Sequence, residues 1–303
     1  MKITTKFFTA IVLLIFSLSF ARADKISILD QKFQAEIKNI EAKLDGVLGV
    51  AIKDLKTGKM FLLNEKEIFP QASSIKIALL FEVFKQVEAG KLKLDEMIPL
   101  QEGQKVEGSG VLFQLGYPSL SLSVKDLCVL MVILSDNTAT NILIDKAGMD
   151  NVNKRMDSLG LKDTRLRRKM MDLKAAMAGN ENISTPLEMM TLLEKIRNGT
   201  AIKDPQRLEL LKILSVVNES KDSPIKEAIP ANIPVASKHG ELEMVRCDSG
   251  IVELKDRPYI ICVMTTYLKS EKAGEEVIAQ ISKLAFEYFV QIQNSSEYGR
   301  LLY

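Results

Sequence analysis

The sequence predicts an α/β chain of the α+β type, with an antiparallel sheet built from both chain ends, flanking helices and an all-helical lobe. Between about residues 73 and 214, amphipathic segments follow one another, separated by Gly and Pro, as in a set of packed helices. The strand-like runs lie outside that region, over 47–52, 60–63, 235–238, 250–253 and 259–264. Such a chain has a cleft between its two lobes, which is where ligand sites usually lie.

The first 23 residues predict a signal peptide. Lys2 and Lys6 form a positive region, a mostly apolar stretch runs over 7–20, and Ala21 and Ala23 are the small residues that a signal peptidase reads. The apolar stretch is too short to span a bilayer comfortably, and the cleavage site has no cysteine for a lipid anchor. We therefore expect a periplasmic or secreted protein with no stable membrane anchor after cleavage before Asp24.

The remaining elements follow in order. Apolar residues with helical spacing predict a helix over about 27–45, and Lys56-Thr57-Gly58 supplies a turn between the first two strands. A long helix over 271–291 closes the chain. We expect one catalytic domain over 24–303, with a sheet lobe over about 24–68 and 220–303 and a helical lobe over about 69–219.

Composition argues against several classes of partner. Removing the three basic residues of the leader from 41 leaves 38 against 39 acidic residues, a net charge of about −1. The positive charge of each short basic run is balanced by acidic residues nearby in the sequence. We therefore expect that the chain binds neither nucleic acid nor membrane surfaces. We also expect a monomer.

Cysteine and histidine usage argues against metal or thiol chemistry. Cys128, Cys247 and Cys262 lie in apolar runs and are expected to be small core residues without a disulfide. His239 is the only histidine, which excludes a histidine-based zinc cluster. No metal and no organic cofactor is implied.

Three short segments fit together as one active site, and they are Ser73-Ser74-Ile75-Lys76, Ser135-Asp136-Asn137 and Lys238-His239-Gly240. A serine needs a base beside it to act as a nucleophile, and a lysine three residues on lies one helical turn away. Pro70 favours a helix start close to Ser73. A second S-x-x-K, over 223–226, is interpreted as a surface loop without catalytic meaning.

In these motifs the chain resembles the class A serine β-lactamases and their penicillin-binding relatives, whose motif set is S-x-x-K, S-D-N and K-T-G. Phe69-Pro70, Thr164-Arg165-Leu166 and Thr185-Pro186 extend the resemblance over nearly all of the mature chain. It implies a β-lactamase/transpeptidase-like fold and acyl transfer to a serine.

The resemblance assigns a role to each matching residue. Ser73 is the nucleophile, Lys76 accepts its proton with a depressed pKa, and Ser135 passes the proton to the departing nitrogen. Lys238 favours neutral Lys76 and attracts the substrate carboxylate, while Asn137 binds the substrate's side-chain amide. The backbone N–H groups of Ser73 and Glu241 would form the oxyanion hole.

Two positions near the third motif are less certain in role. His239 stands where the family has a hydroxyl that binds the substrate carboxylate, and a protonated imidazole would bind it more strongly. On that interpretation acylation strengthens as the pH falls toward about 6; the alternative is a histidine tolerated on the rim. Arg246 is expected either to bind the same carboxylate or to form a salt bridge on the strand face.

The chain departs from the family at the deacylating base. The glutamate that activates water in class A enzymes aligns with Met170, whose thioether cannot serve as a base. General-base assistance is worth roughly 10²–10⁴-fold, so the acyl-enzyme should hydrolyse slowly. Asp172 could replace the glutamate if the loop is rearranged.

Three functions remain open at this point. The first is a serine hydrolase of the class A type that opens β-lactam rings through a Ser73 acyl-enzyme with slow or atypical deacylation. The second is a cell-wall peptidase, amidase or esterase on another acyl donor. The third is a sensor that is acylated by β-lactams or wall fragments without turnover.

Overall fold

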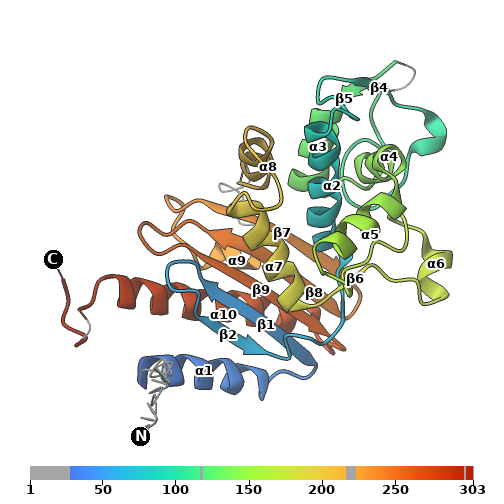
Figure 1. Cartoon of the computed structure of the whole chain (residues 1–303). Coiled ribbons are helices and arrows are strands. Elements are labelled where there is room, and N and C mark those ends of the chain that lie inside the picture. Colours follow the sequence, from blue (N-terminus) through green and yellow to red (C-terminus); the bar gives the residue numbers. More distant parts are fainter. Residues whose placement is uncertain (1–27, 117–118, 216–222, 297, 303) are drawn as a thin grey trace, which may run out of the picture.

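Both ends of the chain contribute strands to one antiparallel sheet, which confirms the α+β architecture (Figure 1). The structure is a computed structural model that describes residues 28–116, 119–215, 223–296 and 298–302. The strand order is β2-β1-β9-β8-β7, and the strands are β1 (Val47–Asp54), β2 (Met60–Leu63), β7 (Val235–Leu242), β8 (Val245–Val252) and β9 (Tyr259–Thr266). The expected signal peptide lies outside the described residues.

Alternating side chains give the sheet two buried faces. In β1, Leu48, Val50 and Ile52 pack into one apolar cluster with residues of α1 (Ile28–Glu41) and α10 (Glu271–Gln293). The intervening Ala51 belongs to the other cluster, which continues into the helical lobe. This period of two is what a strand buried on both faces requires.

The helical lobe is built around α2 (Lys76–Glu88), which is buried along most of its length. Its other helices are α3 (Val124–Ile133), α4 (Asn137–Ala147), α5 (Met149–Ser158) and the short α6 (Leu173–Met177). Between the lobes run α7 (Pro186–Arg197) and α8 (Gln206–Ser215), whereas the short α9 (Pro224–Glu227) packs with α10 on the other face of the sheet. Short pieces complete the chain, namely β3 (Phe69–Pro70) paired with β6 (Ile183–Ser184), β4 (Met97–Pro99) paired with β5 (Ser121–Ser123), and the 3₁₀ helices η1 (Ala72–Ile75) and η2 (Glu102–Gln104).

Local sequence explains where the helices begin and break. Ser123 and Asp126 form a capping box at the start of α3, and Thr185 caps α7, which has Pro186 in its first turn. The long apolar run breaks at Ser135, whose φ of 52° is left-handed, as expected from the S-D-N motif. Asp136 then caps α4 by accepting a hydrogen bond from Ala139 N at 2.8 Å.

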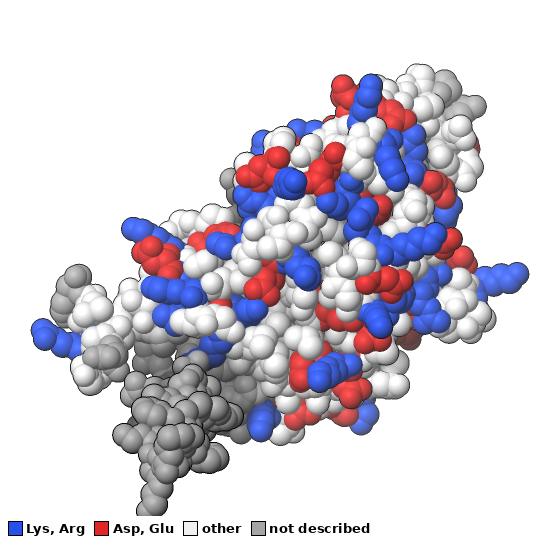
Figure 2. Space-filling model, viewed as in Figure 1, with Lys and Arg blue, Asp and Glu red and all other residues white. Residues whose placement is uncertain are grey.

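Charged side chains of both signs are interspersed over the face shown in Figure 2. Among the described helices, none combines the length and apolar composition needed to cross a membrane. The three cysteines are buried and free, and burial raises the pKa of Cys128 and Cys247 thiols, so they remain protonated.

We predict that Phe33→Ala destabilises the chain by about 3–5 kcal/mol, because it opens a cavity where α1 meets the sheet and α10. Phe33 stacks on Tyr288 and meets Phe61 edge to face, with ring centroids 4.4 and 4.5 Å apart. Urea unfolding measures the loss. Ile28→Ala, on the same helix but exposed, is the control and should change stability by less than about 0.5 kcal/mol. Equal effects would contradict the packing described here.

Candidate active site

Ser73 lies in the turn η1, between β3 and α2, where both lobes meet. Gln71, directly before this turn, is buried; its backbone N–H donates to Asn182 O at 2.8 Å, and Ser74 N donates to Gln71 O at 2.8 Å. Strand β7 runs against this turn at Gly240, where a Cβ would lie 2.4 Å from Gln71 O and 2.7 Å from Ser74 N. Glycine is therefore required for the edge of the sheet to approach the backbone of the nucleophile this closely.

Lys76 is fully buried at the start of α2, one turn after Ser73. Its Nζ donates to Ser135 O at 2.7 Å, Ser135 Oγ at 3.1 Å and Asn137 Oδ1 at 3.2 Å. Burial lowers the pKa of Lys76 well below its ordinary value, and the positive charge of Lys238 lowers it further. A lowered pKa favours the neutral amine, which is the form that can accept a proton.

Asp136 fixes the loop that carries Ser135 and Asn137. Besides capping α4, its Oδ2 accepts hydrogen bonds from Val111 N at 2.7 Å and Leu112 N at 2.9 Å. Asn137 uses its amide to donate to Glu107 O at 3.2 Å. The loop 107–112 is thereby tied to the S-D-N motif by backbone bonds, and the carboxylate has a structural role.

Lys238 is buried on β7, and its Nζ donates to His239 O at 2.9 Å. Burial lowers its pKa to about 8, although the carboxylates of Asp248 and Glu241 oppose the shift. Lys238 therefore remains largely charged at pH 7.

The pH interpretation of His239 was wrong. Burial lowers the pKa of His239 to about 3, and the charges of Lys238, Lys226 and Lys76 add to the effect. Its Nε2 lies 3.8 Å from Glu241 Oε1, too far for a hydrogen bond to offset these terms. The imidazole is neutral at pH 6, so protonation of His239 cannot strengthen carboxylate binding there.

Arg246 does not reach the cleft, and the expectation of a second carboxylate contact is corrected. Its Nε donates to Glu275 at 2.8 Å and its Nη2 to Glu271 at 2.6 Å, both on α10. Its Nη1 donates to Leu242 O and Val245 O at 2.9 Å. Side chains alternate along β8, so Arg246 points to the face opposite Cys247, whose thiol contacts Gln71 O. The strand-face salt bridge is the correct alternative.

Met170 is buried beside the nucleophile, and its backbone is held in place by Asn141 of α4. Asn141 Oδ1 accepts from Met170 N at 2.8 Å, and Asn141 Nδ2 donates to Met170 O at 3.1 Å. Asn141 lies four residues after Asn137, on the same face of α4. This pair of bonds fixes position 170 whatever its side chain.

Asp172 is not brought to the site. Its side chain is exposed, and its Oδ1 accepts from Ala175 N at 2.9 Å to cap α6. It is absent from the lining of the hollow that contains Ser73, so the geometry does not support Asp172 as a replacement base.

The hollow at Ser73 has a volume of about 150 Å³. It is lined by residues of both lobes, which are Ala72, Ser73, Gly108, Ser109, Asn137, Arg168, Met170, Met171, Leu173, Asn182, Glu241 and Leu242. Four of the lining side chains are large and apolar, namely Met170, Met171, Leu173 and Leu242. Ser73 and Glu241 both belong to this lining.

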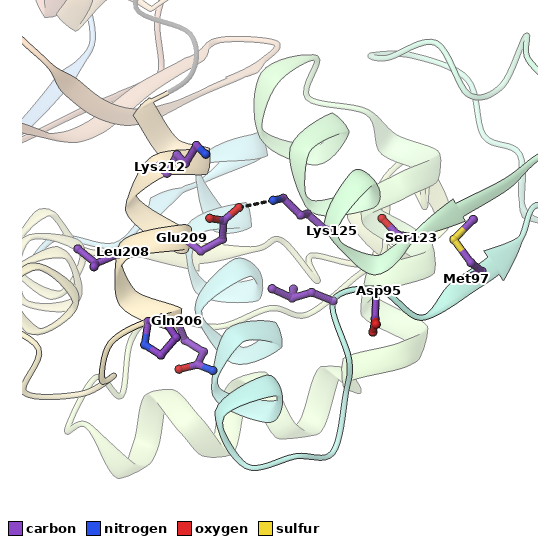
Figure 3. A pocket seen from close by; sticks show the side chains of 10 residues that line it. Asp95, Met97, Ser123, Lys125, Gln206, Leu208, Glu209 and Lys212 are labelled. Atoms are coloured by element: carbon purple, nitrogen blue, oxygen red, sulfur yellow. Dashed lines mark ion pairs between the residues drawn. The ribbon is translucent and has the colours of Figure 1, made fainter.

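A second hollow, of about 690 Å³, lies between α8 and the start of α3 and contains none of the motif residues (Figure 3). Lys125 and Glu209 form an ion pair of 2.7 Å across it. Size alone therefore does not locate the chemistry. Within the described residues, no group of three or more His, Cys, Asp or Glu side chains could hold a metal ion.

The second S-x-x-K motif is not a surface loop, which corrects its interpretation. Ser223 lies directly before α9 and Lys226 lies within it, and both residues are buried. The Ser223 hydroxyl donates to Asp248 Oδ2, and Ile225 N donates to the same oxygen at 3.1 Å. Asp248 lies on β8, where it pairs with His239 of β7. The motif therefore anchors α9 to the sheet next to His239.

Sequence reasoning missed the residues that support the nucleophile loop. Asn182 Oδ1 accepts from Arg167 N at 2.6 Å and Arg168 N at 3.0 Å, and the Arg168 guanidinium donates to Glu181 at 2.9 Å. These contacts join segments more than ten residues apart, so no local pattern signals them. Asn141 could have been found from its spacing to Asn137.

Comparison with known proteins agrees with the site. A model of the β-lactamase enzyme family matches residues 32–289. An imipenem-hydrolysing β-lactamase of Enterobacter cloacae is 30% identical over 259 residues, which cover 83% of this chain and 88% of its own length. β-Lactamase SME-1 of Serratia marcescens is 27% identical over 259 residues, covering 83% and 87%.

Solved structures agree as well. A β-lactamase from Sphaerobacter thermophilus has a TM-score of 0.78 at 32% identity, covering 86% of this chain and 97% of its own. A variant of PBP-A, solved as an acyl-enzyme with penicillin G, has a TM-score of 0.78 at 25% identity, covering 86% and 97%. Fold and motifs thus define a class A β-lactamase-like serine hydrolase. This chain belongs to the β-lactamase enzyme family.

We predict that His239 titrates near pH 3 in the folded chain, against about 6.5 when unfolded. Because the folded-state pKa is the lower one, the unfolded chain binds the extra proton. This contribution to stability is complete above about pH 6.5 and is lost as the pH falls toward 3. As the sole histidine, its ring gives one NMR signal to follow. A midpoint between pH 6 and 7 would contradict the prediction, and His239→Gln should weaken the pH dependence of unfolding.

Proposed function

We propose that the chain is acylated at Ser73 by β-lactams and that the acyl-enzyme hydrolyses slowly. The observation that carries the proposal is Met170, buried in the hollow beside Ser73 at the position where the family has its water-activating glutamate. A thioether accepts hydrogen bonds only weakly and cannot take a proton from water.

The proposed acylation uses the three motifs together. Neutral Lys76 takes the Ser73 proton as Oγ attacks the β-lactam carbonyl, and the C–N bond of the ring opens. Ser135, within 3.1 Å of Lys76 Nζ, passes a proton to the departing nitrogen. Lys238 attracts the substrate carboxylate, with neutral His239 beside it, and Asn137 orients the side-chain amide. The N–H groups of Ser73 and Glu241 would stabilise the oxyanion.

Relatives support a β-lactam as acyl donor. Those with the clearest sequence similarity are named β-lactamases, and PBP-A was captured in this fold with penicillin G bound covalently. From the leader and this family we also propose cleavage after residue 23, export, and a monomeric catalytic domain over 24–303 with the two lobes described above. Resistance to antibiotics would then depend on how fast the acyl-enzyme turns over.

We predict that excess benzylpenicillin forms one covalent adduct with the mature chain. Measurement of the intact-protein mass over time detects it. The adduct should appear quickly and persist, because Met170 cannot activate water. Ser73→Ala is the control and should show none. An unmodified mass with consumption of penicillin would indicate efficient turnover and contradict slow deacylation. If no adduct forms and no penicillin is consumed, the β-lactam hypothesis is refuted and another acyl donor is favoured.

A second prediction concerns the missing base. Met170→Glu should raise the deacylation rate by roughly 10²-fold, because Asn141 holds the backbone at 170 independently of the side chain. The decay of the benzylpenicillin adduct after removal of free drug measures it. Met170→Gln, which has the same length but no basic carboxylate, is the matched control. Equal rates in both variants would show that the geometry, rather than the base, limits deacylation.

A further inference from the structure

An exposed apolar ridge continues outward from the hollow that contains Ser73. Met171 and Leu173 line that hollow, yet their side chains are 44% and 64% exposed. Met177 is 89% exposed and lies four residues after Leu173, on the same face of α6 and about 6 Å along it. We call these three side chains the α6 ridge.

The α6 ridge is held in a fixed position. Asp172 caps the N-terminus of α6, and Asn180 N donates to Ala175 O at 2.9 Å to close its other end. Met171 has a left-handed φ of 62° and reaches the opposite rim, where a Cβ on Gly108 would lie 3.1 Å from its sulfur. A conformation this rare for methionine persists only where surrounding contacts impose it.

Three large apolar side chains are exposed at or next to the hollow that contains Ser73, and neighbouring exposed apolar side chains indicate a ligand that covers them. We propose, resting on the acyl transfer proposed above, that the acyl donor for this site carries an unbranched apolar chain that lies along the α6 ridge. The ridge begins at the hollow, so a chain attached to the acyl carbon reaches Met171 and Leu173 first and Met177 last. Methionine side chains adapt readily to such chains.

The chemistry of the step follows the same machinery. Ser73 Oγ forms a bond to the acyl carbon, the bond from that carbon to the leaving oxygen or nitrogen breaks, and the serine proton goes to Lys76. With an ester of p-nitrophenol the leaving group is p-nitrophenolate, whose release reports acylation directly. The acyl chain length is then the only variable.

The test compares p-nitrophenyl acetate, butyrate, hexanoate and octanoate by the rate of the first p-nitrophenolate release. We expect the second-order acylation constant to rise about twofold for each added CH₂, as partial burial of a methylene predicts. Met177→Ser should lower the octanoate-to-butyrate ratio severalfold, and Leu173→Ser should lower it further. The adaptable Leu173→Met should keep the wild-type ratio.

Leu208→Ser is the matched control, since Leu208 is similarly exposed but lies on α8, in the hollow of Figure 3. It should leave the ratio unchanged. A flat chain-length series, or an equal effect of Leu208→Ser, would overturn the inference. Benzylpenicillin adduct formation on the same samples separates the two proposals. An adduct with a flat series refutes only the ridge, whereas no reaction with either reagent refutes acylation at Ser73.

Discussion

The structure depends on one buried amine. Lys76 is the first residue of α2, yet its Nζ is bonded to the loop that joins α3 to α4. Burial and the positive charge of Lys238 both favour its neutral form, and each of the two amines donates to a backbone carbonyl oxygen. The helical lobe and the sheet lobe therefore meet at Lys76, the group that we propose accepts the Ser73 proton.

Close backbone approach completes the arrangement. The turn of Ser73 is pressed between β6 and β7, with Gly240 as the contact on one side and Asn182 as the partner of Gln71 on the other. Ser73 itself adds little to this packing. Its position is determined by neighbours from both ends of the chain, which is how a small side chain can be placed accurately without bonds of its own.

Much of this could be predicted from the sequence, and the reasons differ by residue. The periods of apolar residues predicted that strands from both chain ends build the sheet. Short-range spacing predicted that Lys76 lies beside Ser73 and that the helix breaks at Ser135. The carboxylate contact of Arg246, one of its two expected roles, and the surface position of the second S-x-x-K were wrong for a common reason. Which face of a strand a side chain takes, and whether a helix is covered, depend on register and on packing partners far along the chain. The expected protonation of His239 failed because burial, and after it the charges of Lys238, Lys226 and Lys76, lowers its pKa, and burial depends on packing that no local pattern reports.

The three buried thiols have a consequence for the life of the molecule outside the cell's reducing interior. Cys128, Cys247 and Cys262 are inert while packed, since burial keeps each of them protonated. In the oxidising compartment that the leader predicts, unfolding would expose all three to disulfide formation, and any cross-link among them would be incompatible with the native sheet. Unfolding would then be irreversible, because the new disulfides would prevent refolding. For a chain exported as proposed, persistence would be set by the rate at which the fold opens, rather than by the balance between folded and unfolded states.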